Sequence, residues 1–246
     1  MEILYIKNRN DNYKTVNEVL KNEFNISARL RLKLINNKLI FLNGANCNTK
    51  DLIQENDQIK ISFDYDEVSE NIVPIKMMLD NVYEDEWFLV VNKPAGIAVH
   101  PSILHFEDSL SNGIKYYFDQ IGLKKKIRPV NRLDKNTSGL VIFAKCEYVQ
   151  EQLISQMQKN IFKKDYLAIV DGILTTKHGT IDLPIARKAN SIIERCIDEN
   201  GQKSVTHYEV VKEFDAYSLV KCTLETGRTH QIRVHFKAIG HPLIRR

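Results

Sequence analysis

The stretch that decides the fold is Arg128-Pro-Val-Asn-Arg-Leu-Asp-Lys-Asn-Thr-Ser-Gly-Leu140. It places one carboxylate, Asp134, between two cations, Arg132 and Lys135. A Thr-Ser-Gly turn follows, and the apolar run 140–144 then predicts a short strand. A strand, a polar turn and a second strand would present Asp134 at a strand end, where it could act as a nucleophile. The alternative is an ordinary turn aspartate, because Asp, Asn, Ser and Gly are the usual turn-forming residues.

Length and composition set the outer limits. A chain of 246 residues can form one large domain, or a large domain and a small one. The hydrophobic content of 43% and the charged content of 27% are typical of a folded soluble protein. A net charge of +4 permits RNA binding without arguing for it. The four cysteines are widely spaced and read as reduced thiols, and no apolar run reaches membrane-spanning length, so we expect a cytoplasmic protein.

Residues 1–66 predict a small α+β domain in the order helix, basic helix, hairpin. Thr15-Val-Asn-Glu18 is a capping-box pattern that opens a helix. Ser27 is placed to cap a second helix, and Asn43-Gly44 is a hairpin turn between the strands 39–42 and 59–63.

This region resembles the alpha-L RNA-binding motif named after a small-subunit ribosomal protein. The match runs through Ser27, Arg29, Leu34-Ile35, Ile40-Phe-Leu-Asn-Gly44, Lys50 and Asn56-Asp57-Gln-Ile59. The resemblance implies contacts to RNA phosphates, which position RNA without reading its sequence. A solvated helix face is the alternative. The implied RNA-binding residues are Arg29, Arg31, Lys33 and Lys38.

The acidic run 64–71 predicts a linker, which we place at 67–80, and a second domain over 81–246. The run 87–91 reads as a buried strand, with 97–99 as another strand leading out of the turn that follows. The basic run 124–128 is either a solvated loop or a phosphate contact. Helices are predicted at 108–121 and 147–159, and strands at 162–170, 180–183, 204–211 and 217–224.

The last segment, 226–243, predicts a helix that Thr229 caps and that Gly240 ends. His230 and His235 are five residues apart, which is a poor spacing for two ligands of one metal on a helix. They therefore read as hydrogen-bonding scaffold.

Five segments together resemble the RluA/RluD-type pseudouridine synthases. They occur in the family's order and span residues 82–243. The segments are Tyr83-Glu-Asp85, Val90-Val-Asn-Lys-Pro-Ala-Gly96, Arg132-Leu-Asp-Lys-Asn-Thr-Ser-Gly139, Lys164-Asp-Tyr-Leu-Ala168 and Gly227-Arg-Thr-His-Gln-Ile-Arg-Val-His235.

The resemblance implies an α+β fold with a mixed, mostly antiparallel sheet and flanking helices. It also implies a bacterial monomeric enzyme that converts uridine in RNA to pseudouridine with no cofactor and no metal. Large-subunit (23S) ribosomal RNA is the first candidate substrate and transfer RNA the second. The resemblance implies that Asp134 is the essential carboxylate and that Tyr166 contacts the target base. It implies that Arg228 is the arginine that pairs with the carboxylate. The remaining predicted substrate contacts are Asn131, Arg132, Leu133, Thr137, His230, Gln231 and Ile232.

The chemistry suits these residue types. A carboxylate can attack the sugar C1′ or assist loss of a ribose proton, and both routes stay open. A guanidinium favours the ionised carboxylate and orients it, but it cannot donate a proton at neutral pH. Tyr166 or a water could remove the C5 proton. The uridine must leave its helix before it reacts.

Two departures from the family pattern stand out. Asn131 occupies a position where the family usually has His, and Asn cannot titrate. Family members also continue beyond His-Pro-Leu243, so we expect a catalytic domain shortened at its C-terminus. The rival readings are a non-catalytic RNA-binding protein and a glycosidase. The glycosidase would need two carboxylates, and Asp165, beside Tyr166, would face the opposite side of its strand.

Overall fold

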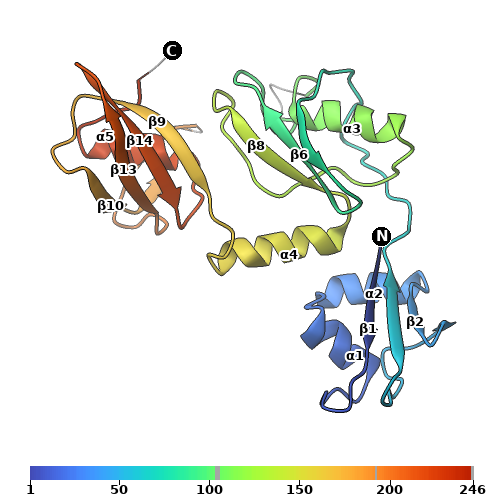
Figure 1. The fold of residues 1–246 in the computed structure, drawn as a ribbon. Coiled ribbons are helices and arrows are strands. Elements are labelled where there is room, and N and C mark those ends of the chain that lie inside the picture. The colour runs from blue at the N-terminus through green and yellow to red at the C-terminus, as the bar shows by residue number, and fades with distance from the viewer. Residues whose placement is uncertain (103–105, 192, 245–246) are drawn as a thin grey trace. The chain divides into compact units, whose positions relative to one another are not determined.

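The structure, a computed structural model, describes residues 1–102, 106–191 and 193–244 (Figure 1). It divides into two compact units, Met1–Ser155 and Gln156–Arg246. The boundary falls inside helix α4 (Glu147–Gln158) and thus inside the predicted catalytic domain. The division at 66 and the linker at 67–80 stay predictions.

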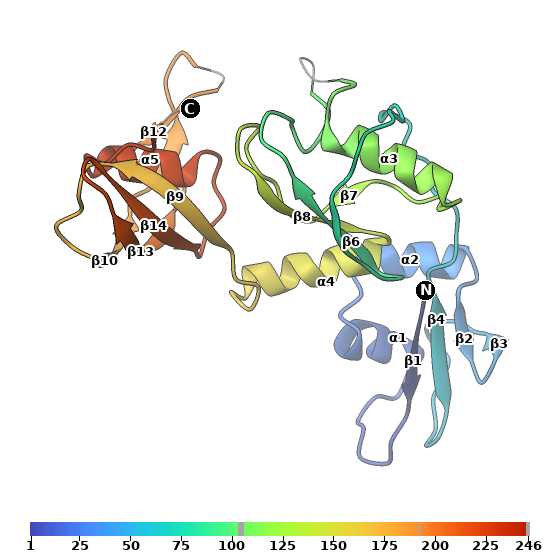
Figure 2. The same cartoon turned by 45° about the horizontal axis from the view of Figure 1, so that its top comes forward.

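The first 63 residues form an antiparallel sheet in the order β1-β4-β2-β3, with helices beside it (Figure 2). Strand β1 was not predicted from the sequence, and it pairs with β4 along its whole length. Asn43 and Gly44 both have positive φ (50° and 84°), as the predicted hairpin turn requires, but the strand that returns from the turn is the short β3 and not the predicted strand 59–63. The elements are β1 (Glu2–Ile6), α1 (Val16–Glu18), the π-helical turn η1 (Val19–Glu23), α2 (Ala28–Asn36), β2 (Ile40–Leu42), β3 (Ala45–Asn46) and β4 (Gln58–Ser62).

Both helix caps predicted in residues 1–66 are confirmed. The Thr15 hydroxyl accepts a hydrogen bond from the Glu18 N–H at 3.3 Å, and the Ser27 hydroxyl accepts one from the Leu30 N–H at 3.2 Å. These bonds satisfy N–H groups that the first helical turn leaves without partners. Leu30 and Leu34 are fully buried, so α2 turns its apolar face to the core.

A second sheet of the first unit has the order β5-β6-β8-β7, and helix α3 covers it (Figure 1). Its core joins β6 and β8 to α3 through Leu89, Val141 and Ile114. Residues 97–99 do not form the predicted strand, and Ala98 makes one isolated bridge, to Ser109. The elements are β5 (Asn81–Glu84), β6 (Phe88–Lys93), α3 (Leu110–Gln120), β7 (Arg128–Pro129) and β8 (Gly139–Ala144).

The predicted linker and the basic run 124–128 meet in a buried ion-pair network. Glu67 has a side chain that is only 3% exposed, and it accepts from both Arg128 guanidinium nitrogens (2.7 and 2.6 Å) and from Lys33 (2.7 Å). Burial opposes ionisation, but the hydrogen bonds from Arg128 and Lys33 outweigh it and lower the pKa of Glu67 to about 2. Lys125 donates to the carbonyl oxygens of Phe63 and Tyr65. Lys125 and Arg128 therefore hold the unit together, which corrects the phosphate-contact reading for these two residues.

The second unit is built on an antiparallel sheet in the order β10-β13-β14-β9 (Figure 1). Phe236 of helix α5 is fully buried against Val170 and Val220 of the sheet. The helix starts one residue later than predicted, because its N-cap is His230 at φ 60° and not Thr229. The elements are β9 (Asp165–Asp171), β10 (His178–Asp182), β11 (Ile185–Arg187), β12 (Arg195–Ile197), β13 (Val205–Glu213), β14 (Tyr217–Leu224) and α5 (Gln231–Ala238).

Both units therefore combine antiparallel sheets with flanking helices, as the predicted α+β class requires. Within the described ranges, no helix is long and apolar enough to cross a membrane.

Candidate functional site

The loop that carries Asp134 leaves β7 and returns into β8. Asn131 holds the two sides of this loop together: its side-chain N–H donates to the Leu140 carbonyl oxygen at 2.9 Å, and its side-chain oxygen accepts from the Ile142 N–H at 2.9 Å. The carboxamide thus replaces a pair of backbone hydrogen bonds and continues the β7–β8 pairing by one step. Inside the loop, the Thr137 N–H donates to the Asp134 carbonyl oxygen at 3.0 Å, which closes a turn.

A buried lysine supports the other side of the same loop. Lys93 is fully buried, and its ammonium group donates to the carbonyl oxygens of Pro94, Ile97 and Lys135 at 2.8–3.0 Å. The Gly96 N–H also donates to the Lys135 carbonyl oxygen, at 2.9 Å. Burial lowers the pKa of Lys93, and the Asp134 carboxylate opposes this shift. The backbone beside Asp134 is therefore fixed by a cation that lies close enough to act on the carboxylate.

The turn that carries Arg228 is held by Gln231, which is 2% exposed. The Gln231 side-chain oxygen accepts from the Thr226 hydroxyl (2.8 Å) and the Arg228 N–H (3.0 Å). Its amide group donates to the Val205 carbonyl oxygen (2.9 Å) and the Thr206 hydroxyl (3.0 Å). The carboxamide is fully used by protein groups, so this geometry does not support the predicted contact of Gln231 with substrate.

His235 continues this network and is completely buried. Its Nε2 faces the Leu183 carbonyl oxygen and its Nδ1 faces the Thr206 hydroxyl, both at 2.9 Å. A carbonyl oxygen can only accept, so Nε2 carries the proton and Nδ1 accepts from Thr206. Burial lowers the pKa of His235 and keeps the ring neutral. His235 is therefore scaffold, as the histidine spacing predicted.

Tyr166 lies on β9, where it is half-buried and packs against the core of the second unit. Its neighbour Asp165 is exposed and accepts from the Thr223 hydroxyl at 2.6 Å. The two side chains thus lie on opposite faces, as expected for adjacent strand residues. Asp165 is therefore a poor second carboxylate for a glycosidase site around Tyr166.

The remaining predicted substrate contacts differ in exposure. Arg132 is exposed, whereas Leu133 packs against the first unit's core and Ile232 against the core of the second. His230 adopts the left-handed conformation that starts α5. Asp134 belongs to one unit, and Tyr166 and Arg228 belong to the other. Each unit therefore fixes its own part of the candidate site.

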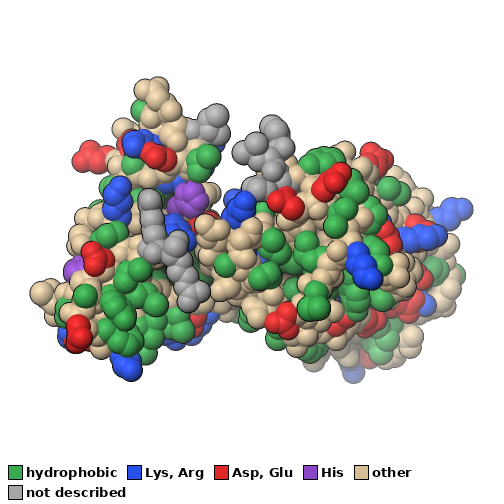
Figure 3. Space-filling model, turned by 90° about the horizontal axis from the view of Figure 1, so that it is seen from above, with side chains coloured by type: hydrophobic (Ala, Val, Ile, Leu, Met, Phe, Trp, Pro, Cys, Tyr) green, Lys and Arg blue, Asp and Glu red, His purple; other side chains and the backbone are tan. Residues whose placement is uncertain are grey.

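The four predicted RNA-binding residues, three in α2 and Lys38 just after it, also differ in how their charges are held. The Arg29 side chain is 91% exposed, with Glu147 4.0 Å away, and Lys38 is exposed. Lys33 is paired with Glu67 and Glu147, and Arg31 donates to the Ile26 carbonyl oxygen. Only Arg29 and Lys38 thus present their charges outward. On the face shown in Figure 3, basic side chains are scattered among acidic and hydrophobic ones.

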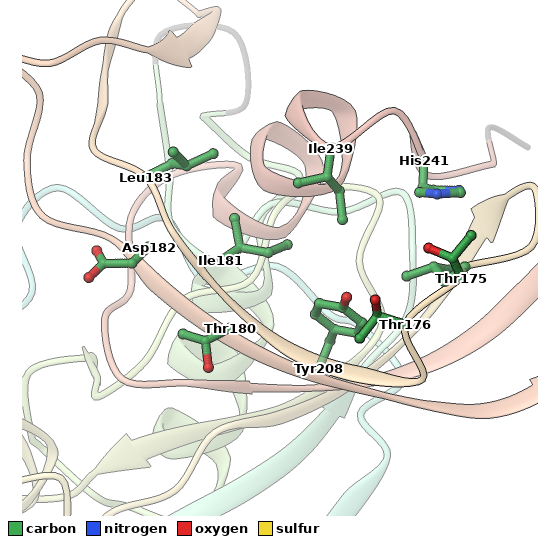
Figure 4. Close-up of a pocket in the computed structure, with 10 residues that line it drawn as sticks. Thr175, Thr176, Thr180, Ile181, Asp182, Leu183, Tyr208, Ile239 and His241 are labelled. Carbon is green, nitrogen blue, oxygen red and sulfur yellow. The ribbon is translucent and has the colours of Figure 1, made fainter.

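A cavity of about 520 Å³ lies in the second unit, and none of the predicted site residues lines it. Figure 4 shows Ile181, Tyr208, Ile239 and His241 around it. In the described part of the chain, no three His, Cys, Asp or Glu side chains gather in a way that could hold a metal ion.

The sequence did not reveal two scaffold roles. Lys93 was not singled out, and Gln231 was expected to contact substrate rather than to clamp a turn, although both lie in segments that match the family. The available signal for the first was a lysine placed only two residues after the apolar run 87–91. No local signal identifies the second, because its partners come from β13.

Comparison with known proteins identifies the family to which the chain belongs. The family model of the RNA pseudouridylate synthases matches residues 87–238. An uncharacterized RNA pseudouridine synthase of Bacillus subtilis, YjbO, is 39% identical over 82% of this chain and 71% of its own length. The ribosomal large subunit pseudouridine synthase D of Pasteurella multocida is 36% identical over 88% of this chain and 67% of its own.

A solved structure supports the fold. Human RNA pseudouridylate synthase domain containing 1 is 29% identical and has a TM-score of 0.57, with 68% of this chain and 67% of that chain covered. The chain described here belongs to the RNA pseudouridylate synthase family, in its RluA/RluD branch, and is an isomerase that acts on uridine in RNA.

Proposed function

We propose that this enzyme isomerises uridine in large-subunit ribosomal RNA, with Asp134 as the catalytic carboxylate. The observation that carries the proposal is the match to several ribosomal large subunit pseudouridine synthases D, at 36–37% identity over 82–88% of this chain. Asp134 is the carboxylate of the Arg-Leu-Asp segment, and its loop is fastened from both sides by Asn131 and Lys93. A fixed carboxylate suits catalysis, since small displacements of a reacting group are costly.

The reaction breaks the C1′–N1 bond of uridine and forms a C1′–C5 bond, so that the C5 proton is lost and N1 gains a proton. Asp134 attacks C1′ or assists loss of a ribose proton while the uracil turns. Tyr166 contacts the base, where an aromatic ring contributes about 1–3 kcal/mol by stacking. The family resemblance assigns to Arg228 the role of orienting the carboxylate, which a guanidinium can do by a charge-assisted hydrogen bond.

Release of tritium from C5-labelled uridine tests this proposal. Transcripts of large-subunit ribosomal RNA, small-subunit ribosomal RNA and transfer RNA are incubated separately with the enzyme. We expect release from the large-subunit RNA, and loss of that release in Asp134→Asn. Asp119→Asn is a matched control, because Asp119 pairs with Lys115 on the surface of α3. Release by Asp134→Asn at the wild-type rate would refute the catalytic role, and release from transfer RNA alone would refute the substrate.

The exposed cations of the N-terminal part supply a separate RNA contact in this proposal. Arg29→Glu together with Lys38→Glu should weaken RNA binding and flatten its dependence on salt. Lys33 is unsuited to this test, because reversing its charge would also break its buried ion pair with Glu67. An unchanged salt dependence would remove this part of the chain from the RNA path.

A further inference from the structure

The positive charge of this chain is concentrated in the second unit. Residues 156–246 hold 15 Lys and Arg against 10 Asp and Glu, a net charge of +5. Residues 1–155 hold 20 against 21, a net charge of −1, so the second unit accounts for the whole excess of +4. Because RNA is attracted through its phosphates, this unit is where a basic contact is to be sought.

One lysine of this unit differs from the other cations that the structure removes from water. Lys93, Lys125, Arg128 and Lys145 are buried, and each donates to a carbonyl oxygen or a carboxylate. Lys164 is half-buried. Yet among residues 1–102, 106–191 and 193–244 no hydrogen-bond acceptor or carboxylate lies within bonding distance of its ammonium group. Partial burial of a charge is unfavourable without a partner, so the position suits an anion from outside the protein.

The surroundings of Lys164 add to this argument. Its backbone is fixed, because the Leu224 N–H donates to its carbonyl oxygen at 3.0 Å. Its ammonium nitrogen lies 3.5 Å from the point that a side chain on Gly227 would occupy, next to Arg228. Burial and the like charge of Arg228 both lower the pKa of Lys164. Two cations thus lie close together on the turn and strand that carry two of the proposed site residues.

The Lys164 side chain also lies on the same side of the chain as Tyr166, the proposed base contact. Lys164 precedes Tyr166 by two residues, so the two side chains lie on the same face of the extended chain. Lys163 and Asp165 are exposed on the opposite face.

We propose that the ammonium group of Lys164 binds a backbone phosphate of the substrate RNA, next to the uridine that Tyr166 contacts. This inference rests on the proposed function, since it takes Tyr166 as the base contact. Arg228 keeps its role toward the carboxylate and adds its charge to the phosphate site. The contact is to the backbone, so it adds affinity and register without reading the base.

The test is the salt dependence of RNA binding. Fluorescence anisotropy with a large-subunit ribosomal RNA transcript is measured at several KCl concentrations for Lys164→Ala and for Lys163→Ala. Both variants lose one positive charge, one residue apart and on opposite faces. We expect Lys164→Ala to bind about tenfold more weakly and its log–log salt slope to fall by roughly 0.7, the value for one phosphate contact on a single strand. Lys163→Ala should change both quantities much less, and Lys164→Arg should restore most of the affinity.

Equal effects of the two alanine variants would overturn the proposal, because they would reflect net charge alone. Lys164→Gln, checked with Lys164→Ala by circular dichroism, guards against a folding defect, and a folded Gln variant with wild-type affinity would also overturn it. Tritium release at subsaturating RNA should fall about tenfold in Lys164→Ala, in step with the lost affinity. Tritium release that persists in Asp134→Asn would refute the proposed function. The phosphate site is tested separately, by the RNA affinity and salt dependence of the Lys164 and Lys163 variants.

Discussion

Only the first of the two units buries charged side chains in the described ranges. Among residues 1–102 and 106–155, it buries four cations, Lys93, Lys125, Arg128 and Lys145, and fixes them on carbonyl oxygens and carboxylates. It also buries the neutral side chains of Ser62, Ser109, Ser111 and Asn112. The buried polar side chains of the second unit are neutral in the described ranges, and they are Ser204, Thr206, Ser218, Gln231 and His235. A charged network tolerates the loss of one member poorly, because it leaves an uncompensated charge. A neutral network fails by leaving single donors and acceptors without partners.

The largest effect is expected from Glu67→Gln in the first unit. Removal of the carboxylate leaves Lys33 and the buried Arg128 without their shared partner, and we expect the free energy of unfolding to fall by about 4 kcal/mol. Trp87, the single tryptophan of the chain, lies in this unit, so its fluorescence in urea reports the change. Glu70→Gln, an exposed glutamate three residues away, is the control. Equal midpoints for both variants would mean that the ion-pair network adds nothing to stability.

A smaller loss is expected from Gln231→Ala in the second unit. The variant removes four hydrogen bonds, and the buried Val205 carbonyl oxygen and Thr206 hydroxyl each lose one of their partners, which should cost about 3 kcal/mol. Cys222 is fully buried in this unit, so its rate of thiol labelling in urea measures the loss. Cys146, buried in the first unit, is the internal control. Faster labelling of both cysteines by the same factor would show that the units do not respond separately.

Asn131→Ala tests a neutral clamp of the first unit. The side chain is half-buried, so we expect a loss of only about 1 kcal/mol in stability. In single-turnover tritium release, the rate constant should fall about tenfold while the amplitude stays complete, because the loop that carries Asp134 is less well held. Asn200→Ala, in an exposed turn of the second unit, is the control. A wild-type rate constant in Asn131→Ala would show that the clamp does not position Asp134.

The smallest effect is expected from mild acid, which acts on one histidine in each unit, because burial also lowers the pKa of His100 in the first unit. The pKa of His235 is lowered in the folded protein, so its contribution is complete above its ordinary value near 6.5 and is lost as the pH falls. The Glu67 pKa is lowered from 4.5 to about 2, so the loss from this group begins only near pH 4.5. Compared with its rate in the unfolded chain at the same pH, labelling of Cys222 should therefore speed up between pH 7 and 5. His235→Gln should remove this pH dependence, and its persistence would assign it to another group.

Several features could be predicted from the sequence, because their causes are local. The Thr15 and Ser27 caps, the Asn43-Gly44 turn and the alternating strands of the second unit depend on residues close together in the chain. Strand β1 and the missing strand at 97–99 could not be predicted in this way. The first depends on pairing with β4, and the second on packing beneath α3.

The candidate site shows the same limit. The sequence alone determined which segments carry the chemistry, because Asp134, Tyr166 and Arg228 each lie in a recognisable local pattern. Tertiary structure decided the role of the charges and amides around them. Lys33, Lys125 and Arg128 looked like RNA contacts but are bound by Glu67 and by backbone carbonyl oxygens from distant segments. Gln231 looked like a substrate contact but fastens a turn to β13. A polar side chain takes its role from the partner it meets, and in a folded chain that partner is usually far away in the sequence.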